Sequence, residues 1–515
     1  MAPTTTILAA DKAASTTTPA NNTNPRWWKD PGMRRLQVHL SILLLGSFVC
    51  GFDGSVMSGF FGIASFLSDM DDPDANKQGL LTAAISLGYL IGFIPASWLA
   101  DRFGRRWPQL IGSWIVVVAV FVQVFALGGW KFFGARLLLG FGAAFPLTVG
   151  SAHVFELAHP RQSMQMATAF GAAYWVGAVV SSWSTFGSTF LSSNWAWRLP
   201  ALLQGLASLI QGIFLYWVPE SPRFLCAQGR TEEAHAVLAK YHANGSMDDE
   251  LVLEEMAQIQ TALDLEREAS GFGYLDFLKT KANRYRLFLC VWIGFMTQFL
   301  GNAIISYYLV PILASIGIES VPAQQGINGG LQIFNLLVSV VATIYCQSIS
   351  RRFMWLLSTG GILVMYSCIT ACSAVYAQNG SPGAGRATVA FIYLYSGLYD
   401  IAWSVFFYSY VLEILPYGQR TKGMAICLFV DYAALFFAQY ANPPAFAAMG
   451  WKYYTIYIAV IAVNLVVVYF CFPETAGLTL EQSAALLDGD AVQKKLDDAA
   501  KAALAADKKD DELSV

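Results

Sequence analysis

Residues 219–225 read Pro-Glu-Ser-Pro-Arg-Phe-Leu and open the one long polar interval between the two ends of this chain, which extends to Asn283. About six apolar segments lie on either side of this interval, each about 20 residues long. That is the length an α-helix needs to cross the hydrocarbon core of a bilayer. The sequence therefore predicts an all-α membrane protein, with two pseudo-symmetric six-helix halves joined by a soluble linker.

The composition also favours a membrane protein. Of the 515 residues, 56% are hydrophobic and 13% are charged, whereas soluble domains carry about 25% charged residues. The net charge of −3 and the lack of a basic block give no reason to expect a nucleic-acid partner. The eight cysteines are scattered without paired or metal-binding spacing. The sequence also has no nucleophile–base arrangement or phosphate loop, so we expect no enzyme, no metal site and no cofactor.

The orientation of the expected spans follows from Lys and Arg in the short connections. The twelve spans fall near 38–60, 79–99, 108–127, 131–154, 165–189, 199–218, 286–313, 326–347, 354–377, 387–412, 422–441 and 452–472. Basic residues occupy alternate loops, namely Arg102, Arg105, Arg106, Arg161, Arg351, Arg352, Arg420 and Lys422. A loop on the opposite side carries Asp69, Asp71, Asp72 and Asp74. This pattern predicts that both termini and the linker are cytosolic.

Five regions follow from this topology. We expect a disordered cytosolic tail over 1–36, a six-helix bundle over 37–218, a cytosolic linker with short helices over 219–283, a second six-helix bundle over 284–474, and a cytosolic tail over 475–515. The Asn379-Gly380-Ser381 sequon then faces outward and is a predicted glycosylation site. The Asn244 sequon lies in the linker and is not expected to be modified.

The two halves repeat one another. Glu156 near the end of the fourth span corresponds to Glu413 after the tenth, 257 residues later, and Glu220 corresponds to Glu474 after 254 residues. Such near-constant offsets indicate one six-span unit used twice. Two such halves that rock about a site at the membrane midplane form a transporter architecture.

A carboxylate inside the first span is the first functional candidate. Asp53 lies at membrane depth, where an ionisable group is costly and usually functional, and Arg136 in the fourth span is its natural partner. Protonation of Asp53 would break the pair and change the local packing, which is a proton-coupling switch. The alternative is a static pair that fixes helix packing.

Charged residues at the cytosolic ends of the spans form a candidate gate. A network that joins the two halves would latch the outward-open state, whereas single exposed pairs contribute little. The alternative is that these charges only set the topology. The gate candidates are Asp101, Arg102, Arg105, Arg106, Glu156, Arg161, Glu220, Arg223, Glu413, Arg420 and Glu474.

Polar and aromatic residues in the second half are candidate substrate ligands. Amides both donate to and accept from hydroxyl groups, and aromatic rings stack on the apolar face of a sugar. The spacing of Asn328, Gln332 and Asn335 puts three amides on one helix face. The other candidates are Gln298, Asn302, Tyr307, Tyr308, Trp403, Asp431 and Asn442. The alternative for each is a hydrogen bond between helices, and Asp431 also fits a second protonation site or a substrate that is not a plain sugar.

With these motifs the chain resembles the sugar porter family of the major facilitator superfamily over about 36–485. The motifs are Asp101-Arg102-Phe103-Gly104-Arg105-Arg106, residues 219–225, and Pro473-Glu474-Thr475 through Glu481. The stretches around Gln298, Asn328 and Glu413 look most like the fungal lactose-permease-like and hexose transporter branch. The resemblance implies alternating access at the plasma membrane, import of a mono- or disaccharide with a proton, Asp53 and Arg136 as the coupling pair, and Gln298, Asn328 and Trp403 in the sugar site.

Two other functions stay open. Gly171 and Ala303 stand where the family usually has amides, and together with Asp431 they favour transport or efflux of a polyol, an organic acid or a secondary metabolite on the same scaffold. A non-transporting sugar sensor is the third reading, and the short C-terminal tail argues against it. We expect a monomer in the lipid bilayer.

Overall fold

The computed structural model describes residues 23–24, 26–269, 273–345, 349–416, 419–476 and 487. Most of the two expected tails, 1–36 and 475–515, therefore lies outside the described residues, as do Tyr417 and residues 477–481 of the last motif. The described chain is helical throughout and contains no strand. This agrees with the all-α fold class expected from the sequence.

The N-terminal half, called the N-half below, comprises α2 to α8. Its helices are α2 (Pro31–Phe60), α3 (Ala64–Asp69), α4 (Ala75–Phe103), α5 (Arg106–Val124), α6 (Gly129–Leu157), α7 (Ser163–Ser188) and α8 (Trp195–Phe214). The first bundle helix begins at Pro31, not at residue 37, which corrects the expected end of the tail. Asp30 caps it, because its carboxylate accepts a hydrogen bond from the backbone N–H of Met33 at 2.9 Å and Pro31 suits the first helical position.

The linker folds into short helices that attach to the N-half. They are α9 (Pro222–Ala227), α10 (Thr231–His242), α11 (Glu250–Ala269) and the 3₁₀ helix η4 (Tyr274–Leu278). Asn244 donates to Asp30 at 2.8 Å and accepts from the backbone N–H of Gly32 at 3.1 Å. These two bonds and the packing of α10 against α2 fix the first part of the linker on the N-half.

The C-terminal half, or C-half, comprises α12 to α19. Its helices are α12 (Lys281–Phe299), α13 (Asn302–Ser315), α14 (Val321–Tyr345), α15 (Arg351–Asn379), α16 (Pro382–Tyr399), α17 (Phe406–Ile414), α18 (Arg420–Met449) and α19 (Tyr453–Cys471). Two of the expected spans are broken. The seventh is interrupted by Gly301, which has φ +94°, and the tenth by a π-helical turn, η6 (Asp400–Ser404).

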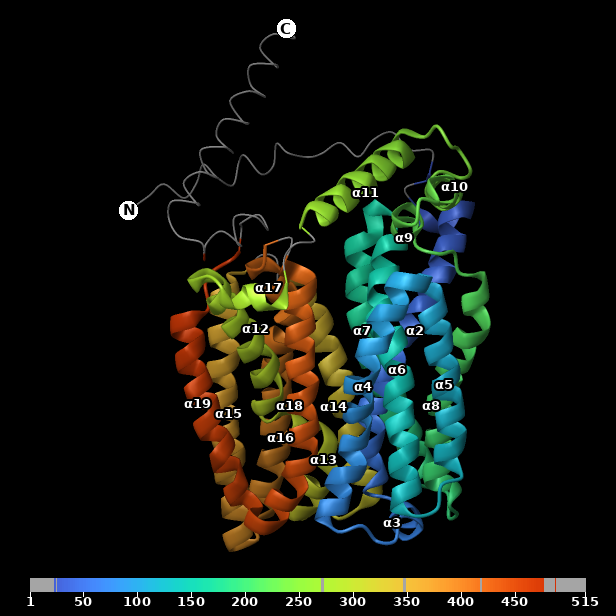
Figure 1. The fold of residues 1–515 in the computed structure, drawn as a ribbon. Coiled ribbons are helices and arrows are strands. Elements are labelled where there is room, and N and C mark those ends of the chain that lie inside the picture. The colour runs from blue at the N-terminus through green and yellow to red at the C-terminus, as the bar shows by residue number, and fades with distance from the viewer. Residues whose placement is uncertain are drawn as a thin grey trace.

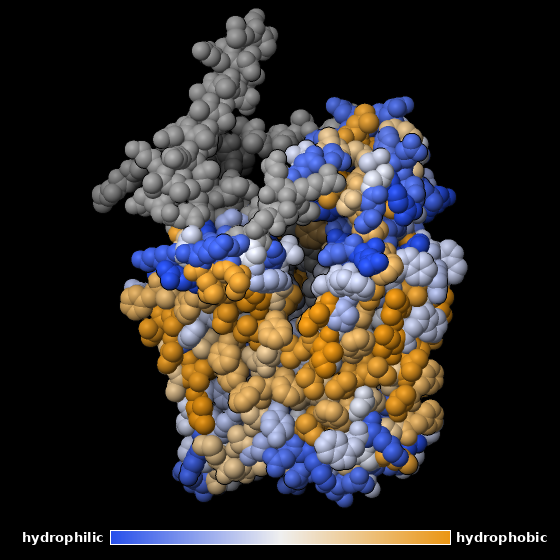
Figure 2. All heavy atoms as spheres, in the orientation of Figure 1, coloured by the Kyte–Doolittle hydropathy of each residue, from blue (hydrophilic) through white to orange (hydrophobic). Residues whose placement is uncertain are grey.

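The surface of the molecule matches a bilayer. Figure 2 shows a hydrophobic belt around the middle of the two halves, with hydrophilic residues gathered at both ends. Within the described residues, ten helical stretches are long and apolar enough to cross a membrane. One of these, Arg420–Cys471, contains both α18 and α19, and α7 is not among the ten.

The two halves stand side by side, with the linker helices at one end of the molecule and α3 at the other (Figure 1). They meet through α4 against α18, α7 against α14 and α2 against α13. Away from the linker, the backbones of α4 and α18 come so close that a Cβ at Gly79 would press on the carbonyl of Tyr440. On the linker side the surface is hollowed between the halves (Figure 2). The halves are therefore closed against each other at the end remote from the linker.

We predict that Gly301→Ala destabilises the protein. The residue combines a left-handed φ with a close approach, because an added Cβ would overlap the ring of Tyr366, which is fully buried and cannot move aside. The expected cost is about 2–4 kcal/mol, measured as a lower Tm in detergent. Gly380→Ala is the matched control, since Gly380 has φ +63° but nothing within 4 Å of an added Cβ. Equal losses in the two variants would contradict the steric role of Tyr366.

Candidate functional site

A chain of polar side chains crosses the boundary between the halves. Gln332 donates to Asn328 at 3.4 Å, and Asn328 donates to Ser182 of α7 at 3.3 Å. Ser182 in turn lies 2.7 Å from the hydroxyl of Ser55 on α2. All four side chains are buried. The helix face of α14 that carries the predicted amides thus faces the N-half.

Asp53 does not form the expected ion pair with Arg136. One oxygen of Asp53 accepts a hydrogen bond from the Gln204 amide of α8, and the other, Oδ2, has no hydrogen-bond partner among the described residues. Arg136 is completely buried, and its three guanidinium nitrogens also have no partner in the described chain. The two charges attract each other only at longer range. The expectation of a paired state is therefore wrong for this conformation, because Gln204 holds Asp53 instead.

Asp431 pairs with a predicted substrate ligand. Its Oδ1 accepts a hydrogen bond from the Gln298 amide at 2.8 Å, which joins α18 to α12. Both side chains are 8% exposed. Each half thus holds one buried carboxylate against the amide of one glutamine, Asp53 with Gln204 and Asp431 with Gln298.

The two predicted tyrosines of α13 lie at the boundary between the halves. A Cβ added at Gly54 would lie 3.1 Å from the hydroxyl of Tyr174 on α7 and 3.8 Å from that of Tyr307, so both hydroxyls converge beside Asp53. Tyr308 stacks on Phe61 of α2 with ring centroids 5.9 Å apart. Tyr308 therefore closes the far end of the boundary.

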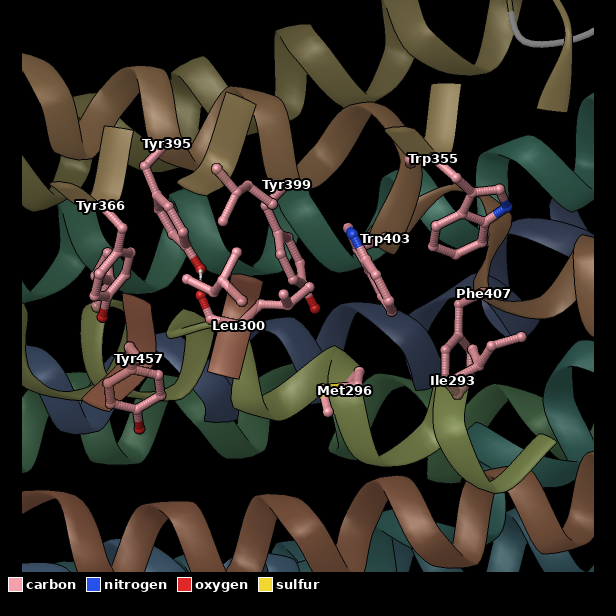
Figure 3. Close-up of a cluster of buried hydrophobic side chains, with 14 of the residues drawn as sticks. Ile293, Met296, Leu300, Trp355, Tyr366, Tyr395, Tyr399, Trp403, Phe407 and Tyr457 are labelled. Carbon is pink, nitrogen blue, oxygen red and sulfur yellow. Dashed lines mark hydrogen bonds between the residues drawn. The ribbon is translucent and has the colours of Figure 1, made fainter. Parts of the chain in front are cut away.

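Trp403 lies in the core of the C-half, between Tyr399 and Trp355 (Figure 3). It is fully buried, its ring meets Trp355 edge to face at 4.6 Å, and its Nε1 donates to Thr359 at 3.2 Å. In this conformation the indole packs helices together and offers no face to a ligand. Asn442 has a similar packing role, because it accepts from the hydroxyls of Tyr453 and Tyr457 at 2.8 and 2.6 Å.

The last two amide candidates lie at the edges of this site. Asn302 begins α13 and accepts a hydrogen bond from Ser306 at 2.9 Å. Asn335 is buried on α14, and its Oδ1 has no hydrogen-bond partner within the described parts of the chain. Asn335 therefore keeps an acceptor free on the amide face of α14.

On the linker side, the N-half builds a charge network around two carboxylates. Arg105 makes two bonds of 3.1 Å to Glu156 and lies 3.6 Å from Asp101. Glu220 accepts from the backbone N–H groups of Arg105 at 2.7 Å and Arg106 at 3.3 Å. Glu220 thus caps the start of α5 and ties the linker motif to the loop between α4 and α5.

The C-half repeats this network. Arg351 lies 3.4 Å from Glu413, and Glu474 accepts from the backbone N–H groups of Arg351 at 2.9 Å and Arg352 at 3.2 Å. Glu474 also accepts from Ser350. Partial burial acts to raise the pKa of Glu474, but the bonds from Ser350 and these amides outweigh it and hold that pKa below its ordinary value.

The contacts of the predicted gate residues described here each stay within one half. Arg102 lies over the ring of Trp98, Arg106 reaches the carbonyls of Tyr216 and Val218 at 3.5 Å, Arg161 reaches Thr23 at 3.4 Å, and Arg420 reaches the carbonyl of Leu415 at 3.1 Å. Arg223 lies in α9 next to Glu220 in the motif. These residues hold each half together in the conformation seen, and a latch between the halves stays a prediction.

Several site residues escaped the sequence analysis. Gln204, Ser55 and Ser182 have no distinctive motif, and Gln325 donates to the carbonyl of Gly59 at 2.8 Å across the boundary. Arg351 was noted only as part of a degraded motif. The repeat could have found it, because Arg351 lies 246 residues after Arg105 and pairs with the counterpart of Glu156.

Comparisons with known proteins agree on one scaffold. The family model described as "Sugar (and other) transporter" matches residues 40–487. The chain is 29% identical over 441 residues to the MFS-type transporter oryC of Aspergillus oryzae, which covers 84% of this chain and 81% of that protein. It is 26% identical over 475 residues to a high-affinity glucose transporter of Kluyveromyces lactis, with 88% and 85% covered.

The solved structures of similar fold include the xylose transporter XylE of E. coli. Its inward open conformation superposes with a TM-score of 0.73 at 20% identity, and the match covers 88% of this chain and 99% of XylE. XylE bound to 6-bromo-6-deoxy-D-glucose, described as a proton:xylose symporter, gives a TM-score of 0.70 at 21% identity, with 88% and 99% covered. At this identity the likeness establishes the fold.

We predict a pH-dependent effect of Glu474→Gln on stability. Because the folded state lowers the pKa of Glu474, its carboxylate stabilises the fold above the ordinary value of 4.5 and loses this contribution as the pH falls through the lowered value. The variant should have a lower Tm than the wild type at pH 5–8, and the difference should shrink below about pH 4.5. Glu232→Gln, on the exposed face of α10, removes the same charge as a control. A difference that grows on acidification would contradict the assignment.

Proposed function

This chain belongs to the sugar (and other) transporter family, and from that premise we propose that it moves a mono- or disaccharide across the plasma membrane together with a proton, by alternating access. The observation that carries this proposal is Asp53, a buried carboxylate at the boundary of the halves with one oxygen unpartnered in the described chain. Members of this family are transporters, so the protein works by binding and conformational change and catalyses no bond chemistry.

We propose twelve membrane spans with both termini and the linker in the cytosol. Two helices, α18 and α19, account for the stretch Arg420–Cys471, and α7 supplies the remaining span beyond the ten apolar stretches. The basic residues on the linker side support this orientation. In this topology the conformation seen is closed toward the outside and open toward the cytosol.

Proton coupling follows from the two unpaired charges of the N-half. A buried charge without a partner is costly, so Asp53 and Arg136 cannot both stay charged and apart without a compensating group. Proton uptake by Asp53 removes one charge and lets Gln204 hold the neutral acid. In the opposite conformation we propose that Asp53 loses its proton and pairs with Arg136. The proton thus shifts the population between the two conformations.

The substrate is proposed to bind between Gln298 on α12 and the amide face of α14. Asn328, Gln332 and Asn335 offer donors and acceptors that suit several hydroxyl groups at once. Tyr307 lies on the opposite side of this site with its hydroxyl close to that of Tyr174. The charge networks around Glu156 and Glu413 are proposed to pair across the halves when the cytosolic side closes.

A second candidate is transport of a small molecule other than a sugar. Asp431 on Gln298 is the observation that favours it, since a carboxylate beside the substrate amide selects hydrogen-bond donors or a cationic group. The similarity to oryC, whose name specifies no sugar, leaves room for this candidate. Uptake of glucose, xylose, galactose, lactose, cellobiose and glycerol by a yeast without its own sugar transporters distinguishes the two.

We predict that Asp53→Asn abolishes accumulation of substrate against a gradient and spares counterflow. The amide cannot carry a proton, but it can accept from Gln204 as the acid does, so substrate exchange continues. The measurement is radiolabelled uptake at acidic pH with and without a protonophore.

Asp69→Asn serves as the matched control for Asp53→Asn. Asp69 is also a carboxylate of the N-half, but it lies at the far end, where it accepts from Trp197 at 2.9 Å. This control should keep uphill uptake. If Asp53→Asn still concentrates the substrate, Asp53 is not the coupling group.

We predict that Asn379 carries an N-linked glycan in a eukaryotic cell. Asn379 is exposed at the end of α15 remote from the linker, whereas the side chain of Asn244 is bonded to Asp30 and Gly32. Asn379→Gln should remove a glycosidase-sensitive shift in gel mobility, and Asn244→Gln should not. A glycan at Asn244 would overturn the proposed topology.

A further inference from the structure

A third membrane carboxylate, Asp400, lies where the tenth span is broken. It is the first residue of the π-helical turn η6, between α16 and α17. The turn packs against α14, α15, α16 and α17. π-Turns inside helices are rare and frequently mark functional sites, because the extra residue disturbs the hydrogen-bond ladder. Asp400 thus occupies a joint of the C-half that neither the coupling pair nor the substrate amides use.

Asp400 has no compensating group in this conformation. Its side chain is 1% exposed, its Oδ2 is buried without a hydrogen-bond partner, and the described chain gives it no ion pair. The titratable groups that face it are the hydroxyls of Tyr395 and Tyr399 on α16 and of Tyr174 on α7. From α14, α15 and α17, no charged group of the described residues acts on it. Asp53 and Asp431 differ, since each accepts from a glutamine amide.

The environment decides which form of Asp400 can be buried here. An ionised carboxylate without partners costs several kcal/mol in a packed interior, whereas the neutral acid costs only its unmade hydrogen bonds. The conformation seen therefore accommodates the protonated acid. A conformation in which water or a donor reaches the turn accommodates the carboxylate.

We propose that Asp400 is a second proton-binding group, protonated while the joint between α16 and α17 is packed as seen here and deprotonated to water when the joint opens. This inference rests on the proposed proton-coupled cycle, to which it adds a proton site in the C-half. By linkage, a group that binds a proton in one conformation and releases it in the other makes the balance between them depend on pH. Acidic pH then favours the conformation seen.

Infrared spectroscopy of the reconstituted full-length protein tests the protonation state directly. At pH 7 the wild type should show a carbonyl-stretch component of a protonated carboxylic acid that is missing in Asp400→Asn. Asp53→Asn and Asp431→Asn should keep that component, which assigns it to Asp400 alone. A spectrum in which Asp400→Asn retains every protonated-acid component would overturn the proposal.

Counterflow measured from pH 5 to pH 8 tests the consequence for transport. Asp400→Asn keeps a neutral side chain of the same shape at every pH, so its counterflow rate should lose the pH dependence of the wild type. Asp400→Glu restores a protonatable group and should restore that dependence, which a merely structural role would not. Equal pH profiles for Asp400→Asn and the wild type would contradict the proposal. Uphill uptake by Asp53→Asn reports separately on the coupling pair, so the two proposals fail independently.

Discussion

Inside a membrane, a polar side chain must find its partner within the protein, because neither lipid nor packed helices supply water. The boundary between the two halves is built under this constraint. Ser55, Ser182, Asn328 and Gln332 form one continuous chain of bonds across it, and Gln325 bonds to a carbonyl of the opposite half. These contacts align α14 with α7 and α2, and they place the substrate amides at the midplane.

The same constraint makes the unpartnered groups informative. Gln204 and Gln298 each compensate one carboxylate, while Arg136 and Asp400 stay buried without a hydrogen bond in the described chain. Unmet groups of this kind are costly, and a protein that changes conformation can satisfy them in its other state. The N-half and the C-half thus each hold one polar group whose requirements this conformation does not meet.

The duplicated networks on the linker side explain how each half moves as a unit. Glu220 and Glu474 cap equivalent helices, α5 and α15, and Glu156 and Glu413 hold equivalent arginines. The sequence repeat predicted this correspondence, since capping and pairing need only the right residues at constant offsets. It wrongly suggested contacts between the halves for the conformation seen, because the same charges satisfy one another within each half.

The sequence by itself determined the all-α membrane fold, the two halves and the linker, because apolar length and loop charge act locally along the chain. It also located Asp53, Gln298 and the amide face of α14. Only the tertiary structure decided which partner each polar group takes. Gln204 holds Asp53 in place of Arg136, Trp403 packs against Trp355, and the tenth span breaks at Asp400. Those choices depend on how helices far apart in the sequence pack together, and no spacing within a helix encodes them.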